Sequence, residues 1–246
     1  MNKISLFNIE LSSVTLQELL SQLNKGVLIT PNVDHLVKLQ KDEDFLACYH
    51  AADWVVCDSK IVNLAAKFLG KKIKEVIPGS SFLPAFYNHH KDNKNIRIFL
   101  LGAAEGVGEV AMENINKKVG WDIVIGTHSP SFGFEKNEKE CDQIIDIINK
   151  SDANVLVVGV GAPKQEKWIM KYKSQLYKVD IFMALGATID FEAGNVQRAP
   201  QIIQKFYLEW LYRLFKEPKR LWRRYLIEDM VFVFMVLKQK IKALVQ

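Results

Sequence analysis

The sequence predicts an α/β fold, in which a mostly parallel sheet carries helices on both faces. Strand-like and helix-like segments alternate along most of the chain, which is the order that parallel sheets require. The strand-like segments are continuous apolar runs, which indicate strands buried on both faces. With 246 residues, 49% of them hydrophobic, the chain is long enough for one sizeable domain. Collagen-like and largely disordered chains are excluded.

Six segments have the short, β-branched or apolar composition of such strands: 26–30, 54–57, 96–102, 123–128, 155–159 and 181–185. Helix-like segments are expected at about 14–24, 34–50, 59–69, 80–92, 105–118, 136–150 and 163–176. Thr15 and Glu18 have the spacing of a capping box at the start of the first helix. Pro163 stands where the first turn of a helix tolerates proline.

Charge is unevenly distributed along the chain. The formal net charge is +5, but residues 198–246 carry 11 Lys and Arg against 4 Asp and Glu, so residues 1–197 are slightly negative. No internal repeat and no long linker separates the two parts. We therefore expect one α/β domain over 1–197 and a helical appendage over 198–246, with an anionic partner for the appendage.

The appendage has an amphipathic pattern. Phe206, Trp210 and Leu214 fall at helical spacing, and Pro218 breaks the run. A second helix follows, with three arginines on one side: Arg220, Arg223 and Arg224. Such segments are typical of surfaces that meet anionic lipid head groups. Two other interpretations stay open: binding of a phosphorylated ligand, and a helical hairpin packed on the body with a solvated basic face.

Several classes of protein are disfavoured by what the sequence lacks. Three scattered cysteines and no Cys/His cluster argue against a disulfide framework or structural zinc. The N-terminus has no signal-peptide core, and the longest apolar run, 230–237, is far shorter than the roughly 20 residues of a membrane span. We expect a cytosolic protein with peripheral membrane contact. The run 230–237 could pack on the body, on a second subunit or on lipid, and its alternating Phe and Val predict burial on several sides.

The chemistry is expected at one edge of the sheet, because ligands of open parallel sheets bind beyond the carboxyl ends of the strands. Polar and glycine-rich segments follow five of the six predicted strands: 30–35, 58–60, 102–106, 159–166 and 186–191. Their convergence would build a cleft with carboxylates, amides and backbone N–H groups. The glycine turns match neither GxGxxG nor a P-loop. Each is either an anion site or a turn that lets a helix pack close to a strand.

Individual residues at this edge have two interpretations each. Asp58 is either the N-cap of the helix that follows or a catalytic base in the cleft. Thr30 and Asn32 are either turn residues around Pro31 or ligands for a sugar or phosphate. Three neighbours have simple structural roles: Asp34 as a helix cap, His35 as a packed or surface residue, and Glu166 as an acidic residue at a helix start.

Taken together, these segments resemble the WecG/TagA/CpsF family of bacterial glycosyltransferases over nearly the whole chain. The motifs that carry the resemblance are TPNVDHLV (30–37), DWVVCDSKIVNLAAKFLG (53–70), VIPGSSF (76–82), IFLLGAAEGV (98–107), VVGVGAPKQEKWI (157–169), GATIDFEAGNVQRAP (186–200) and LEWLYRLFKEPKRLWRRY (208–225). The last three, in this order, are specific in combination.

The resemblance implies a Rossmann-like fold with a C-terminal helical appendage. It implies transfer of a sugar, commonly of the N-acetylmannosamine type, from a UDP donor to a polyprenyl-diphosphate-linked acceptor in teichoic acid or polysaccharide synthesis. Inversion without a metal or cofactor is expected, with Asp58 as base beside Thr30 and Asn32. The expected substrate contacts are Gly102, Gly159, Gly161, Lys164, Gln165, Asp190, Arg213, Arg220, Arg223 and Arg224.

The chain departs from the family pattern at two points. Ser59 and Lys60 follow Asp58 where many members have glycine, and Val76 and Ser81 stand where many have arginine and aspartate. These departures leave the donor sugar open, and the sequence also leaves the oligomeric state open. Two other functions remain: a nicotinamide-dependent oxidoreductase, which the missing GxGxxG disfavours, and a non-enzymatic peripheral membrane module.

Overall fold

The computed structural model describes residues 2–196, 200, 203, 209–216, 218–223 and 228–245. Its centre is a six-stranded sheet in the order β4-β3-β8-β7-β5-β6, and every neighbouring pair is parallel. The strands are β3 (Gly26–Ile29), β4 (Trp54–Val55), β5 (Ile98–Gly102), β6 (Val124–His128), β7 (Val155–Gly159) and β8 (Ile181–Ala184). The predicted α/β fold class and all six predicted strands are confirmed.

Helices connect the strands. They are α1 (Leu16–Gln22), α2 (Val33–Lys38), α3 (Glu43–His50), α4 (Lys60–Phe68), α5 (Gly79–His89), α6 (Val107–Val119), α7 (Glu138–Lys150), α8 (Lys164–Tyr172) and α9 (Thr188–Ala193), with short 3-10 turns η1 (Phe134–Lys136) and η2 (Lys173–Gln175). The capping box of Thr15 and Glu18 is present. The single helix predicted at 34–50 is wrong, because Asp42 caps a new helix by accepting a hydrogen bond from the Phe45 N–H.

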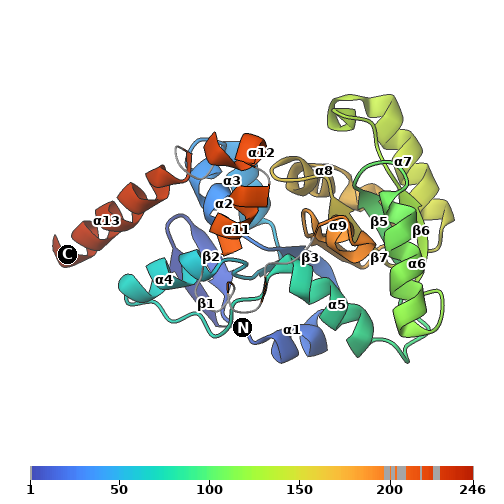
Figure 1. The fold of residues 1–246 in the computed structure, drawn as a ribbon, viewed down its shortest axis with the longest axis horizontal. Coiled ribbons are helices and arrows are strands. Elements are labelled where there is room, and N and C mark those ends of the chain that lie inside the picture. The colour runs from blue at the N-terminus through green and yellow to red at the C-terminus, as the bar shows by residue number, and fades with distance from the viewer. Residues whose placement is uncertain are drawn as a thin grey trace.

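Alternate residues of each strand point to opposite faces of the sheet, and both faces are buried. In β3, Val27 and Ile29 join one hydrophobic cluster and Leu28 joins the other. The first cluster includes residues of α2, α3, α4, α7 and α8, and the second includes residues of α1, α5, α6 and α9. Figure 1 shows α2, α3 and α8 above the sheet and α1 and α5 below it. Burial on both faces explains why the strands are continuous apolar runs.

An N-terminal hairpin was not predicted. Strands β1 (Lys3–Leu6) and β2 (Ile9–Ser12) pair antiparallel, and the Ser12 hydroxyl accepts a hydrogen bond from the Val55 N–H at 3.2 Å, which joins the hairpin to β4. Apolar residues alternate with polar ones here, as expected of a sheet with one wet face. The strands are so short that the pattern falls below what periodicity detects.

The C-terminal part contains α11 (Glu209–Lys216), α12 (Pro218–Arg223) and α13 (Met230–Val245). Helix α13 packs on the body through Phe232, whose ring centre lies 5.6 Å from that of Phe7, and through Val236. Of its other apolar residues with a described side chain, Met235 is partly buried against the same cluster, and the rest are exposed: Met230, Val231, Val233, Phe234, Leu237 and Ile241. Burial on several sides was therefore a wrong prediction. None of the described helices is long and apolar enough to cross a membrane.

Candidate active site

The loops after β3 and β4 meet at the carboxyl edge of the sheet. Asp58 donates its backbone N–H to the Pro31 carbonyl at 3.1 Å, and its Oδ1 accepts a hydrogen bond from the Gly79 N–H at 2.9 Å. Gly79 begins α5, and a Cβ placed on it would lie 3.3 Å from Thr30 Oγ1 and 3.3 Å from a Leu185 methyl. Asp58, Thr30 and the segment that carries Asn32 thus surround the start of α5.

This meeting point lies at a topological switch point of the sheet. Strands β3 and β8 are neighbours, but the helix that follows β3 joins one hydrophobic cluster and the helix that follows β8 joins the other. The segments that follow the two strands diverge to opposite faces there, and open α/β sheets bind their ligands beyond the strand ends at such a point. The predicted catalytic residues are therefore brought together where a substrate is expected.

Asp58 does not cap the helix that follows it. Ser59 is the N-cap of α4, and its hydroxyl accepts from the N–H groups of Ile61 and Val62 at 3.2 and 3.4 Å. The cap interpretation of Asp58 is thus wrong for α4. Its half-buried carboxylate faces the start of α5 instead, where N–H groups and the helix dipole favour negative charge.

Asn32 has the structural role that its turn position indicated. Its Oδ1 accepts from the His35 N–H at 3.3 Å, so Asn32 is the N-cap of α2. Asp34 is therefore not the cap; it is buried in the first turn and pairs with Lys38 at 2.8 Å. His35 is packed as predicted, with its Nδ1 2.7 Å from the Tyr49 hydroxyl.

Three neighbouring strands end in glycines or lead into one, and the backbones lie very close there. A Cβ on Gly102 would lie 2.6 Å from the carbonyl of Gly159, and a Cβ on Gly159 would lie 2.6 Å from the carbonyl oxygen of Gly186. A side chain at Gly102 or Gly159 would therefore clash with backbone, which cannot move aside cheaply. Gly102 and Gly159, two of the predicted substrate contacts, therefore lie where the backbones of neighbouring turns pack closely.

Gln165 connects the loops after β7 and β8. Its Oε1 accepts hydrogen bonds from the N–H groups of Gly161 at 3.2 Å and Gly186 at 3.1 Å. Its Nε2 donates to Glu166 Oε1 at 2.8 Å, and both side chains are buried. Gln165 thus fixes the distance between two glycine turns at the site, a long-range contact that sequence cannot reveal.

Glu166 was predicted to need no particular role, but it is fully buried. Burial raises the pKa of its carboxyl to about 7, and Asp34 adds to the rise, while the bond from Gln165 and the charge of Lys38 oppose it. Within the described part of the chain its Oε2 has no hydrogen-bond partner. Its visible role is to accept from the Gln165 amide and so set which way that amide points.

Few interactions are described for the remaining predicted substrate contacts. Lys164 begins α8, and its ammonium lies 4.8 Å from the centre of the Phe132 ring. Asp190 is half-buried in the first turn of α9. Exposed Arg223 pairs with Glu228 at 3.3 Å. Arg213 and Arg220 belong to α11 and α12 without a described side chain, and Arg224 lies outside the described residues.

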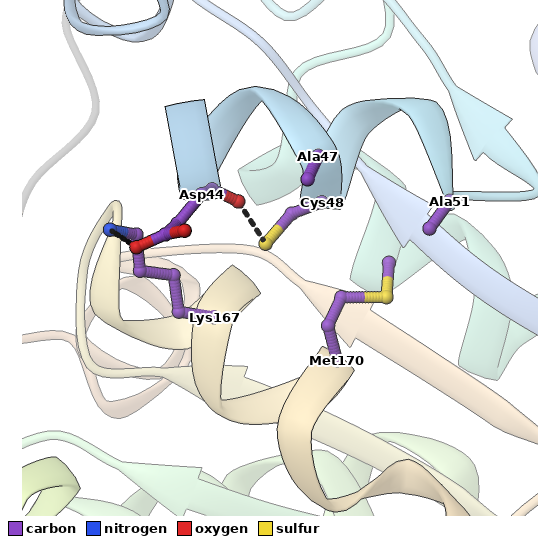
Figure 2. A pocket seen from close by; sticks show the side chains of 6 residues that line it. All are labelled: Asp44, Ala47, Cys48, Ala51, Lys167 and Met170. Atoms are coloured by element: carbon purple, nitrogen blue, oxygen red, sulfur yellow. Dashed lines mark hydrogen bonds and ion pairs between the residues drawn. The ribbon is translucent and has the colours of Figure 1, made fainter. Parts of the chain in front are cut away.

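A surface cavity of about 390 Å³ lies between α3 and α8, and no predicted site residue lines it (Figure 2). Its lining residues are Asp44, Ala47, Cys48, Ala51, Lys167 and Met170. The Cys48 thiol donates to the Asp44 carbonyl at 3.2 Å, and burial raises its pKa to about 11. Such a thiol is protonated near neutral pH and is a poor nucleophile.

No group of three or more His, Cys, Asp or Glu side chains suited to a metal ion occurs among the residues that the structure describes. Gly79 was not among the predicted site residues. The available signal was its position directly after Pro78, at the start of a predicted helix.

The chain is similar to known proteins over most of its length. An N-acetylglucosaminyldiphosphoundecaprenol N-acetyl-beta-D-mannosaminyltransferase of Bacillus spizizenii is 31% identical over 82% of this chain and 76% of its own length. A relative of the same name from Staphylococcus aureus is 25% identical over 98% of this chain and 95% of its own. The model of the WecG/TagA/CpsF family matches residues 4–246. The chain therefore belongs to the WecG/TagA/CpsF family of glycosyl transferases.

Proposed function

We propose that this glycosyl transferase moves a sugar of the N-acetylmannosamine type from UDP to N-acetylglucosaminyl-diphosphoundecaprenol, in the synthesis of a cell-wall or capsular polymer. The names of the two relatives support the sugar and the acceptor. The observation that carries the proposal is the meeting of Asp58, Thr30 and Gly79 at the switch point between β3 and β8, within a chain that matches the family over 4–246.

The proposed mechanism is a single inverting displacement. An acceptor hydroxyl attacks the anomeric carbon, the bond from that carbon to the diphosphate oxygen breaks, and Asp58 takes the hydroxyl proton. One carboxylate suffices, because the leaving UDP needs no proton. The Gly79 N–H and the Pro31 carbonyl hold Asp58 on both its side chain and its backbone. Asn32 and Thr30 then orient the sugar or its phosphate beside this base.

The departing diphosphate needs positive charge, and we propose that side-chain cations supply it without a metal ion. In this proposal Lys164, at the start of α8, is one such cation, and Asp190 of α9 contacts the sugar nucleotide. The arginines of the appendage would close over the diphosphate: Arg213, Arg220, Arg223 and Arg224. The planar guanidinium fork suits two diphosphate oxygens. The glycine turns at Gly102, Gly159 and Gly161 let the backbone come close to the phosphates.

We further propose that residues 198–246 act as an appendage that meets the cytoplasmic face of the membrane, where the lipid-linked acceptor lies. Two features of α13 support this. The face turned away from the body exposes Val233, Phe234 and Leu237. Lys238 and Lys242 lie on the same helix. An exposed apolar face bordered by lysines suits an anionic bilayer surface.

The decisive experiment offers the protein several UDP-sugars with a short-chain N-acetylglucosaminyl-diphosphate lipid. Mass spectrometry is expected to find one added N-acetylhexosamine with UDP-N-acetylmannosamine, and EDTA is expected to leave the rate unchanged. Thermal shift adds a second measurement, because UDP should raise the unfolding temperature and NAD should not. Stabilisation by NAD alone would favour the oxidoreductase, and no transfer from any UDP-sugar would contradict the proposal.

A further inference from the structure

Phe132 is the most exposed large apolar side chain that the structure describes, with 99% of its area open to solvent. It lies in the loop from β6 to α7, beyond the carboxyl end of β6 and so at the edge of the sheet that carries the candidate site. The fold does not account for this side chain, because an aromatic ring left in water adds nothing to the core.

Contacts of the residues before and after Phe132 hold this loop in place. Just before it, Ser131 donates its backbone N–H and its hydroxyl to the Glu140 carboxylate at 2.8 and 2.7 Å. Just after it, Phe134 is buried, with its ring centre 6.1 Å from that of Trp168. The bonds from Ser131 also lower the pKa of Glu140, so the carboxylate that anchors the loop stays charged. The segment that carries the exposed ring is therefore held in place on both sides.

The loop that carries Phe132 contacts two other loops at the carboxyl edge of the sheet. The Ser129 hydroxyl donates to the Ala104 carbonyl at 3.1 Å, which joins the loop to the segment after β5. The Lys164 ammonium, after the glycine turn of β7, lies 4.8 Å from the Phe132 ring centre. Phe132 thus stands beside the turn that contains Gly161, where the proposed function places the phosphates of a nucleotide.

We propose that Phe132 is the stacking surface for the nucleobase of the sugar-nucleotide donor. A flat base stacks well on an exposed aromatic face, and this recognition tolerates different bases because each has a π face. The Lys164 ammonium lies over one face of the ring in a cation–π contact, and the opposite face is free for the base. This inference rests on the proposed function for the use of a nucleotide donor.

The test measures binding of UDP and of inorganic pyrophosphate by calorimetry. Phe132→Ala is expected to weaken UDP binding about tenfold or more, as loss of one stacked base does, and to leave pyrophosphate binding unchanged. Phe132→Trp is expected to restore UDP binding. Tyr177→Ala is the matched control: Tyr177 is 74% exposed with the Lys178 ammonium 6.0 Å from its ring centre, but it precedes β8 and so lies at the other end of the strands.

The outcomes separate this inference from the function on which it rests. If the unaltered protein binds UDP and Phe132→Ala binds it equally well, the stacking role is overturned and the nucleotide donor stands. If the unaltered protein does not bind UDP, both the stacking role of Phe132 and the proposed UDP donor are overturned. Equal losses for UDP and pyrophosphate would assign the effect to loop shape and overturn stacking. So would weaker binding of phosphatidylglycerol vesicles with unchanged UDP affinity, which would make Phe132 a membrane contact.

Discussion

The carboxylate of Asp58 accepts a 2.9 Å hydrogen bond from the backbone N–H of Gly79, the first residue of α5. This bond connects the loop after β4 to the start of a helix that packs on the opposite face from α4. The proposed base is therefore also a structural residue. A useful variant must remove its charge and keep the bond.

Asp58→Asn meets that requirement, because the amide oxygen can still accept from Gly79. We expect a folding stability within about 1 kcal/mol of the unaltered protein and a transfer rate lower by about 10²–10⁴-fold, as for loss of a general base. Asp58→Ala should lose the bond as well, at about 1 kcal/mol of stability. Urea unfolding and product analysis measure the two effects. A transfer rate for Asp58→Asn above one tenth of normal would contradict the base role.

Gln165→Ala should destabilise the protein. It leaves the N–H groups of Gly161 and Gly186 without their acceptor, at an expected cost of about 2 kcal/mol or more. The two glycine turns should also separate, which raises the KM for the donor. Gln175→Ala, at an exposed position in η2, is the control and should change stability by less than about 0.5 kcal/mol. Equal effects of both substitutions on stability would show that Gln165 does not connect the turns.

The sheet and the place of the site could be predicted from the sequence, because both follow from patterns within single segments. Apolar runs such as Val155–Gly159 identify strands, and parallel strands bring the residues after β3 and β4 to one edge. Thr30 and Asp58 were placed correctly for this reason. The splitting of one expected helix at Asp42 could not be foreseen as easily, since a single aspartate inside a helix costs less than about 0.7 kcal/mol and so does not by itself break a helical pattern.

Exact hydrogen-bond roles could not be predicted. Asp58 and Ser59 are both competent N-caps, as are Asn32 and Asp34, and only the path of the backbone decides which side chain faces the free N–H groups. Gln165 was expected to contact the substrate, and its bonds to the glycine turns after β7 and β8 were not predicted. Such choices depend on contacts between segments far apart in sequence.

Glu166 makes stability depend on pH. The folded protein raises the pKa of this carboxyl from 4.5 to about 7, so the folded state keeps a proton that the unfolded chain releases between those values. Because the native state binds more protons there, stability falls as pH rises from about 4.5 to about 7, by about 3 kcal/mol, and is constant above. Protonated Glu166 therefore stabilises the fold on the acid side.

Glu166→Gln should remove this dependence. We expect it to match the unaltered protein near pH 4.5 and to be more stable at pH 8, because it carries no buried charge and its oxygen still accepts from Gln165. Urea unfolding at both pH values measures the difference. Glu113→Gln, at an exposed carboxylate of α6, is the control and should leave the pH profile as it is. An unaltered profile in Glu166→Gln would mean that Glu166 does not titrate in this window.

Substitutions of two phenylalanines of α13 test its packing on the body and its proposed membrane contact separately. Phe232 is 4% exposed against Phe7, and Phe234 is 68% exposed on the other side of the helix. Phe232→Ala should cost about 3 kcal/mol of stability, as for a buried ring. Phe234→Ala should cost less than about 0.5 kcal/mol but should weaken binding to phosphatidylglycerol vesicles, because it removes apolar area from the proposed bilayer face.

Unfolding in urea and co-sedimentation with vesicles measure the two losses on the same variants. Neutral phosphatidylcholine vesicles are the lipid control, and the lysines of α13 predict weaker binding to them and less binding at high salt. If Phe234→Ala sediments with anionic vesicles as well as the unaltered protein does, α13 is not the membrane contact. Its exposed apolar face would then need another partner, because an apolar face of this extent on a basic helix has no role in the packing of the body.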